Sequence, residues 1–198
     1  MRLSVWVDDD GNNPMLTHDP EVHYLLTQQR IERSPFEKLK KREPIFLKLY
    51  EEERLPLSPF TKLPIPTPID VRANRFAIAE KMTAAVLLNH DGTIARSSFG
   101  NIFILINDTL ITNRPSSGMI LDAFSETIEI IARKKKLNVQ YTDGISLELM
   151  RAAEECMTAS TAHGLNLVIG FEEKRYFCKR LDMLIEDICK HLEPNIRF

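Results

Sequence analysis

The stretch from Leu87 to Thr112, LLNHDGTIARSSFGNIFILINDTLIT, carries more structural information than any other part of the chain. Two apolar strand patterns lie on either side of a polar loop, residues 95–101. Within the second pattern, Asn107-Asp108 is typical of a tight turn, so residues 101–107 and 110–112 are predicted to form a hairpin. The stretch therefore predicts a sheet in which a polar loop is held between buried strands.

Helical periodicity lies on both sides of this stretch. Residues 69–82 and 125–137 carry apolar side chains at three- and four-residue spacing, and Asp122 or Ser125 is suited to cap the second helix. Further elements are predicted as strands at 2–7, 23–27, 46–50, 85–89, 139–141, 155–158, 167–171 and 174–177, and as helices at 146–153 and 180–192. Strands and helices mix without strict alternation, which predicts an α+β (α/β) fold with a mixed sheet packed by helices.

The bulk composition excludes several classes of protein. The chain has 198 residues, 43% hydrophobic and 27% charged, with a net charge of −2, which is typical of a globular protein and predicts no nucleic-acid partner. The sequence holds no apolar run of about 18 residues, so neither a membrane span nor a membrane partner is predicted, and a cytoplasmic location is expected. The three cysteines form no Cys-x-x-Cys pair, so we expect free thiols and no metal site.

The polar loop resembles the cofactor loop of the class IV aminotransferases, a pyridoxal-phosphate family. That loop reads Glu-Gly-Ser or Glu-Ala-Ser, two more residues, and then Asn-Ile-Phe. Ser97, Ser98 and the run from Asn101 to Phe103 match it, whereas Arg96 stands at the Glu position. The resemblance implies the C-terminal domain of a D-amino-acid-aminotransferase-like fold, and it places Arg96, Ser98 and Asn101 at the cofactor.

Two later segments resemble the same family in the same order. Residues 120–125, ILDAFS, are similar to its Ile-Leu-x-Gly-Ile-Thr, which implies that Leu121 lies under the cofactor ring and that Phe124 and Ser125 bind phosphate. Residues 157–162, MTASTA, look like its strand-ending Thr-Gly-Thr turn, which implies phosphate contacts from Ser160 and Thr161. Read without the family, Ser125 is a helix cap and the second segment is a strand end. If pyridoxal phosphate binds, we expect the phosphate at the N–H groups of Phe124 and Ser125 and the hydroxyl of Ser160.

The resemblance covers about residues 57–176 and implies a division of the chain. Residues 61–198 are expected to form the C-terminal domain of the family. Residues 1–60 are expected to hold the last strand of the family's N-terminal domain, at residues 2–7, and a linker, and the resemblance implies that the rest of that domain is missing. Because the family dimerises, the resemblance also implies a homodimer.

The residues that carry the family's chemistry depart from its pattern. Counting back without gaps from Asn101 puts Pro64 at the position of the lysine that forms an imine with the cofactor, and proline cannot form one. Lys62 lies two residues earlier, so it is either the catalytic amine, reached by a shift of the loop, or a surface lysine. The family's Glu holds the ring nitrogen protonated, and the permanently cationic guanidinium of Arg96 cannot take that role.

Two functions remain open from the sequence. The first is a pyridoxal-phosphate aminotransferase or aminodeoxychorismate lyase, degenerate at these two positions, which would take a small amino acid or an aminochorismate as substrate. The second is a non-catalytic binding or assembly subunit that retains only the fold.

Overall fold

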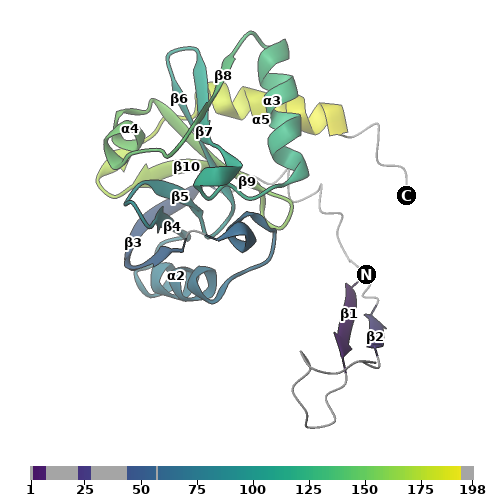
Figure 1. The fold of residues 1–198 in the computed structure, drawn as a ribbon. Helices are drawn as coiled ribbons and strands as arrows, with labels where there is room; N and C mark the ends of the chain where they lie inside the picture. Colours follow the sequence, from purple (N-terminus) through teal and green to yellow (C-terminus); the bar gives the residue numbers. More distant parts are fainter. Residues whose placement is uncertain (1, 8–21, 28–43, 57, 193–198) are drawn as a thin grey trace. The chain divides into compact units, whose positions relative to one another are not determined.

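The structure is a computed structural model, and it describes all residues except 1, 8–21, 28–43, 57 and 193–198. The chain divides into two compact units, Met1–Ser34 and Pro35–Phe198. In the first unit, β1 (Arg2–Val7) pairs antiparallel with β2 (Val22–Thr27), and both strands lie where the sequence predicts them (Figure 1). Large parts of the predicted 1–60 segment lie outside the described residues, and that division of the chain stays a prediction.

Within the described residues, the second unit holds one mixed sheet of nine strands. The strands are β3 (Ile45–Leu55), β4 (Ala84–Asn89), β5 (Ile94–Ser97), β6 (Asn101–Ile106), β7 (Thr109–Asn113), β8 (Asn138–Thr142), β9 (Glu155–Ser160), β10 (Gly164–Phe171) and β11 (Lys174–Arg175). Their order is β5-β4-β3-β10-β9-β6-β7-β8, with β11 paired to β10. β3 runs parallel to both β4 and β10, and β7 runs parallel to β8. The prediction of a mixed sheet is confirmed.

The α-helices are α2 (Pro68–Ala79), α3 (Ala123–Lys134), α4 (Leu147–Ala152) and α5 (Lys179–Leu192), and two short 3-10 helices, η1 (Pro59–Lys62) and η2 (Pro115–Ser117), precede α2 and α3. Two predicted helix boundaries were wrong. α2 ends at Ala79 because Lys81 takes a left-handed conformation, with φ of 59°. α3 begins at Ala123, since Asp122 is its N-cap, and Lys136 likewise has φ of 64°.

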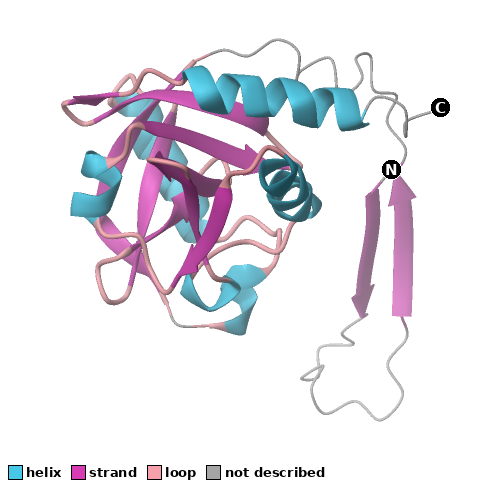
Figure 2. Ribbon diagram, turned by 90° about the horizontal axis from the view of Figure 1, so that it is seen from above, coloured by secondary structure: helices cyan, strands magenta, loops and turns pink. Residues whose placement is uncertain are grey.

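Alternation of side chains along the strands builds a core on each face of the sheet. On β4, Val86 and Leu88 face the interior of the curled sheet, whereas Ala85 and Leu87 pack with Ala73 of α2. Figure 2 shows the strands curling around this interior with the helices outside. α2 therefore covers the outer face of β3 and β4, and it is positioned by a strand that is buried on both faces.

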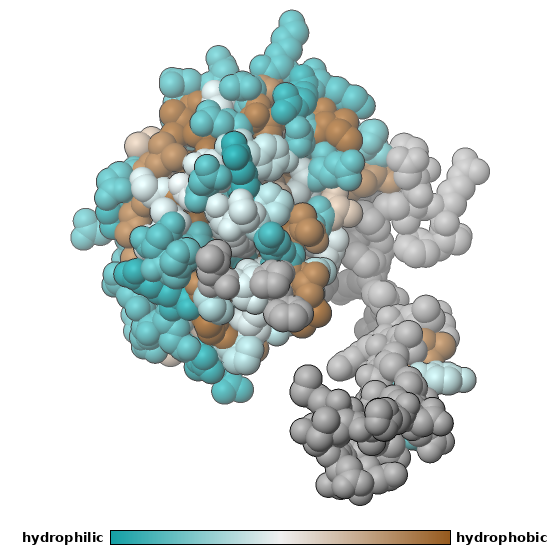
Figure 3. Space-filling view, in the orientation of Figure 1, coloured by the Kyte–Doolittle hydropathy of each residue, from teal (hydrophilic) through white to brown (hydrophobic). Residues whose placement is uncertain are grey.

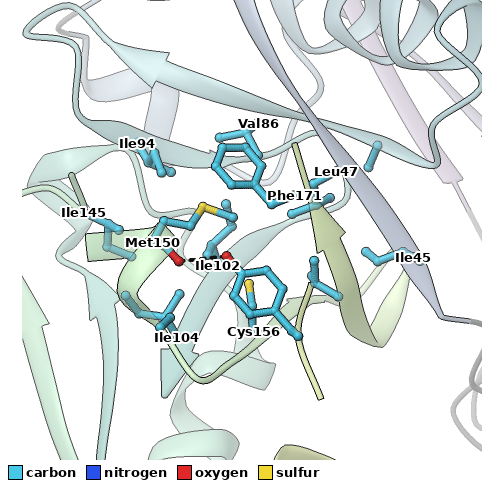
Figure 4. Packing of buried hydrophobic residues seen from close by; sticks show 14 of the residues in the cluster. Ile45, Leu47, Val86, Ile94, Ile102, Ile104, Ile145, Met150, Cys156 and Phe171 are labelled. Atoms are coloured by element: carbon cyan, nitrogen blue, oxygen red, sulfur yellow. Dashed lines mark hydrogen bonds between the residues drawn. The ribbon is translucent and has the colours of Figure 1, made fainter. Parts of the chain in front are cut away.

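The interior cluster is closed by side chains from distant parts of the chain. Ile45 of β3, Phe171 of β10 and Met150 of α4 meet there, and the Tyr176 hydroxyl donates to the Met150 carbonyl over 2.7 Å (Figure 4). A second cluster lies between β6, β9, α3 and α5, and includes Phe103. The two clusters thus lie on opposite faces of β6 and β9, the strands next to the β5–β6 loop.

Among the residues that the structure describes, no helix combines the length and the apolar character that crossing a membrane requires. On the face of the second unit drawn in Figure 3, apolar side chains lie in scattered patches among hydrophilic ones.

Candidate functional site

A tight turn holds the loop between β5 and β6. The backbone N–H of Ser97 donates to the Gly100 carbonyl over 2.9 Å, and the Gly100 N–H donates back to the Ser97 carbonyl over 3.1 Å. Gly100 has φ of +131°, and a Cβ on it would lie 2.3 Å from the carbonyl oxygen of Ala159 on β9. Only glycine combines this backbone conformation with so close an approach, so the loop lies directly against the end of β9.

Ser98 and Asn101 fasten the loop to its neighbours. The Ser98 hydroxyl accepts from the Ala85 N–H over 3.1 Å. The Asn101 side chain donates to the Ile120 carbonyl over 2.8 Å and to the Ser125 hydroxyl over 2.9 Å, and accepts from the Ile120 N–H over 2.8 Å. The structure thus brings together two of the predicted cofactor residues, Asn101 and Ser125, through a direct hydrogen bond.

Arg96 is buried, with only 1% of its side chain exposed, and all of its nitrogen groups are engaged. Its Nε and Nη2 donate to the Asp70 carboxylate over 2.9 to 3.2 Å. Its Nη1 donates to the carbonyl oxygens of Thr61, over 3.0 Å, and of Gly118, over 3.3 Å. A guanidinium has five N–H donors and no acceptor, so these contacts leave Arg96 little capacity for a further ligand.

Asp70 was missed by the sequence analysis. It is the third residue of α2, where its carboxylate accepts from the N–H of the N-cap Thr67 over 2.8 Å, while its own N–H donates to the Thr67 hydroxyl over 3.3 Å. This is a capping box, and the pattern Thr-x-x-Asp at residues 67–70 is the sequence signal that could have found it. The box fixes the carboxylate at the start of α2, in front of Arg96.

Asp122 links two elements that are far apart in the sequence. As the N-cap of α3, it accepts through Oδ1 from the Phe124 N–H over 2.6 Å. Through Oδ2 it accepts from the Thr161 N–H, beyond the end of β9, over 2.8 Å. The Ser125 N–H donates to the Asp122 carbonyl over 3.2 Å. Backbone N–H groups expected to face a phosphate therefore donate to Asp122 itself.

The Ser160 hydroxyl is also engaged within the protein. It donates to the Phe99 carbonyl over 2.8 Å and accepts from the His163 N–H over 3.0 Å. The rings of Phe99 and His163 stack, with centroids 4.3 Å apart and planes 4° from parallel. Sequence analysis singled out neither ring, because nothing local in the sequence indicates that the β5–β6 loop meets the turn after β9.

These residues surround a small cavity of about 140 Å3. It is lined by Pro64, Ile65, Pro66, Asp70, Ser97, Ser98, Phe99, Gly100, Ile120, Asp122, Ser160, Thr161, Ala162 and His163. Among these described lining residues, two are carboxylates and none is lysine or arginine. The cavity therefore offers hydroxyls, an aromatic pair and negative charge.

Lys62 lies beside this region but lines another cavity. Its carbonyl accepts from the Leu121 N–H over 2.9 Å, which places the two backbones side by side. Lys62 lines a cavity of about 310 Å3 that also includes Asn89 and Asp91. Pro64, two residues later, lines the small cavity instead. The hydroxyl of Thr93 lowers the pKa of Asp91 by hydrogen bonding to its carboxylate.

A shallow groove of about 770 Å3 borders the start of α3, and Ser125 and Leu121 line it. Ser125 and Ser160 thus line different hollows, and Asp122 lines both. In the groove, the Tyr141 hydroxyl donates to Glu129 over 2.6 Å. Burial, aided by this hydrogen bond, raises the pKa of Tyr141 to about 12, and the same hydrogen bond lowers the pKa of Glu129.

The fold and the arrangement of these segments define a class of protein. The family model described as Amino-transferase class IV matches residues 1–168, so the chain belongs to the class IV aminotransferase family. Comparison with curated proteins finds no match.

Solved structures of similar fold include several family enzymes. A structure assigned to 4-amino-4-deoxychorismate lyase from Legionella pneumophila is 15% identical, with a TM-score of 0.70, over 89% of this chain and 62% of that one. A branched-chain aminotransferase from Thermoproteus uzoniensis, solved with norvaline, is 19% identical, with a TM-score of 0.68, over 91% and 60%. An aminotransferase from Brucella abortus bound to PLP is 16% identical, with a TM-score of 0.66, over 77% and 55%. At such identities the likeness shows the fold alone, and the chain spans less than two thirds of each relative's length.

The family implies pyridoxal phosphate, and the described residues do not fit it. The cofactor needs an amine, a group at its ring nitrogen and donors for its phosphate. The small cavity has no lysine among its described lining residues, and Arg96 is saturated by Asp70 and two carbonyls. Of the candidate phosphate donors, the N–H groups of Phe124 and Thr161 already bind the Asp122 carboxylate, and the Ser160 hydroxyl donates to the Phe99 carbonyl.

Proposed function

We propose that this chain is a class IV aminotransferase-fold protein that has lost the catalytic use of pyridoxal phosphate and acts as a non-catalytic binding or assembly subunit. The observation that carries this proposal is the buried pair of Arg96 and Asp70, joined by three hydrogen bonds of 2.9 to 3.2 Å. By the family resemblance, Arg96 stands where a Glu would keep the ring nitrogen protonated.

The pair supports this proposal on physical grounds. A guanidinium stays charged at any physiological pH, so Arg96 cannot exchange a proton with a ring nitrogen. Asp70 could in principle serve as an acid, but its carboxylate is shared between Arg96 and the capping box of α2. Pulling either residue toward a ligand would break a buried ion pair, which costs several kcal/mol in proteins.

The second candidate is a degenerate aminotransferase or aminodeoxychorismate lyase with Lys62 as its amine. One observation favours it: the Lys62 carbonyl hydrogen-bonds to Leu121, the residue that the resemblance places under the ring. A rearrangement of residues 62–66 would be needed to turn Lys62 into the small cavity. Its substrate would be a small amino acid or an aminochorismate.

Borohydride trapping separates the two candidates. The purified protein is incubated with pyridoxal phosphate, its absorbance is recorded, and the mixture is reduced and mapped by peptide mass. A non-catalytic subunit shows no imine absorbance and no stoichiometric label. The matched control is Lys81→Ala, because Lys81 follows α2 in the sequence whereas residues 62–66 precede it. Stoichiometric label on Lys62, together with amino-acid turnover lost in Lys62→Ala and kept in Lys81→Ala, would overturn the proposal.

We further propose that the chain is a cytoplasmic homodimer. Support comes from the family resemblance and from apolar side chains at the surface near the proposed site: Leu63, Ile65 and Leu121 are 39%, 62% and 55% exposed. Sedimentation velocity at several concentrations tests this, and a monomer at every concentration would contradict it.

A further inference from the structure

Asp122 behaves as an anion held by the protein's own backbone. Its backbone is extended, with φ of −145° and ψ of 141°, which directs the carboxylate across the start of α3. One oxygen accepts from the Phe124 N–H over 2.6 Å, and the other from the Thr161 N–H over 2.8 Å. The two donors are 37 positions apart in the sequence and belong to α3 and to the turn that follows β9.

The two donors form an anion-binding arrangement. N–H groups at a helix start have no partner within the helix, and the helix dipole favours negative charge there. A further N–H, converging from another element, turns a cap into a two-sided cradle. Both contacts pair backbone N–H donors with a carboxylate, and an ionised acceptor strengthens such hydrogen bonds.

We propose that Asp122 is a specificity-determining residue: its carboxylate stands in for a phosphate group and excludes phosphate-bearing ligands from the cradle of Phe124 and Thr161. The inference rests on the proposed loss of cofactor use, and it names the group that keeps the phosphate out. A dianionic phosphate would have to displace a carboxylate that stays tethered beside the cradle, because it belongs to the N-cap residue of α3.

The charge of the adjoining cavity acts in the same direction. Asp122 lines it together with Asp70, and its described lining residues include no lysine or arginine. Arg96 neutralises Asp70 and points its remaining donors at the carbonyls of Thr61 and Gly118. An incoming phosphate therefore meets the negative charge of Asp122 with no cation among these lining residues to offset it, and like charges repel.

Inorganic phosphate is the probe for the test. Thermal unfolding is followed with increasing sodium phosphate, and with sodium chloride at matched ionic strength, for the wild type, Asp122→Ser and Asp122→Asn. Serine and asparagine both keep an N-cap acceptor for α3. Serine is too short to bridge to Thr161, and asparagine carries no charge. Titration calorimetry with phosphate then gives the affinity of each protein.

The expected result is a gain of binding. Wild type shows no saturable response to phosphate beyond that to chloride. Asp122→Ser binds phosphate saturably, with an affinity at least about tenfold above the upper limit set for wild type, since hydrogen bonds to charged groups contribute that much or more. Asp122→Asn falls between them. The matched control, Ser146→Ala, removes the N-cap of α4 without touching the cradle, and it leaves phosphate binding at the wild-type level.

Two outcomes overturn the inference. Saturable phosphate binding by the wild type means that Asp122 does not block the cradle. No gain in either folded Asp122 variant means that the cradle has no affinity for phosphate once emptied. Neither outcome bears on Lys62, so borohydride labelling of Lys62 remains a separate test of the proposed function.

Discussion

The N-termini of α2 and α3 use the same kind of residue for different partners. Each helix has an aspartate, at the third position of α2 and at the N-cap of α3, whose carboxylate accepts hydrogen bonds from the helix start and from a second group. Asp70 joins the capping box of α2 to a buried guanidinium, that of Arg96. Asp122 joins the first turn of α3 to a backbone N–H, that of Thr161.

The difference between these partners determines what each aspartate contributes. Arg96 stays charged and is almost fully buried, so removal of Asp70 leaves an unpaired positive charge inside the protein. The partners of Asp122 are neutral backbone donors at a surface hollow, so removal of Asp122 leaves groups that water or an anion can satisfy. The first aspartate is thus expected to stabilise the fold, and the second to control what binds.

Replacement of Asp70 by alanine is expected to have the largest effect. It leaves the Arg96 guanidinium buried and unpaired, which costs about 3–5 kcal/mol of unfolding free energy. Urea unfolding followed by far-ultraviolet circular dichroism measures the loss.

Two further variants sharpen this test. Glu53→Ala removes the carboxylate of the exposed ion pair with Arg72 and should cost far less than Asp70→Ala. The double variant Asp70→Ala with Arg96→Met should recover much of the lost stability, since no charge remains buried. A loss below about 1 kcal/mol in Asp70→Ala would mean that the pair behaves like a surface ion pair.

Replacement of Asp122 by alanine is expected to have a smaller effect. It removes the N-cap of α3, which contributes about 0.5–2 kcal/mol, and the link to the turn after β9. The same urea experiment measures it, with Ser146→Ala as a cap without a second link. If Asp122→Ala proves as costly as Asp70→Ala, the contrast between the two helix starts is lost.

Tyr141→Phe tests a third carboxylate, Glu129, further along α3. Loss of the 2.6 Å hydrogen bond is expected to cost about 1 kcal/mol near neutral pH, reduced by the partial exposure of Glu129. The hydrogen bond lowers the pKa of Glu129, so its contribution is present above the unfolded pKa and is lost as the pH falls through the folded pKa.

The difference in stability between wild type and Tyr141→Phe should therefore shrink in acid. It should also shrink at alkaline pH, because the pKa of Tyr141 is raised to about 12 in the folded protein. The stability contributed by the neutral hydroxyl of Tyr141 is present below its unfolded pKa and is lost as the pH rises through about 12. Urea titrations of both proteins across the pH range check the acid and the alkaline decrease. A stability difference that does not change with pH would contradict the proposed contribution of the hydrogen bond between Tyr141 and Glu129.

The fold was predictable where local pattern determines structure. The β6–β7 hairpin follows from Asn107-Asp108 between two apolar runs. For α3 the sequence indicated the helix and offered Asp122 as one of two caps, although the predicted start was two residues too late. The extent of β3 was not predictable, because Ile45 finds its partner Val168 across most of the chain. No local periodicity reports such a pairing.

The candidate site shows the same limit. Sequence resemblance identified Asn101, Ser125 and Ser160, and the structure brings their segments to one end of the sheet. What occupies their donors and acceptors could not be predicted, since Asp70 reaches Arg96 and Asp122 reaches Thr161 only once the sheet has curled. Hydrogen-bond partners that meet only through tertiary contacts have no fixed spacing in the sequence, so no sequence pattern predicts them.

The place of β10 in the sheet also has a consequence for how the protein is made. β10 lies between β3 and β9 and so joins the half of the sheet that contains β3, β4 and β5 to the half that contains β6 to β9. Roughly a hundred residues separate the end of β3 from the start of β10, and a ribosome takes about 5–20 s to add them. During that interval the edge of β3 has no β10 to pair with, and an unpaired edge is a site for aggregation. The two halves of the sheet therefore cannot be joined until late in translation, after β10 has been synthesised.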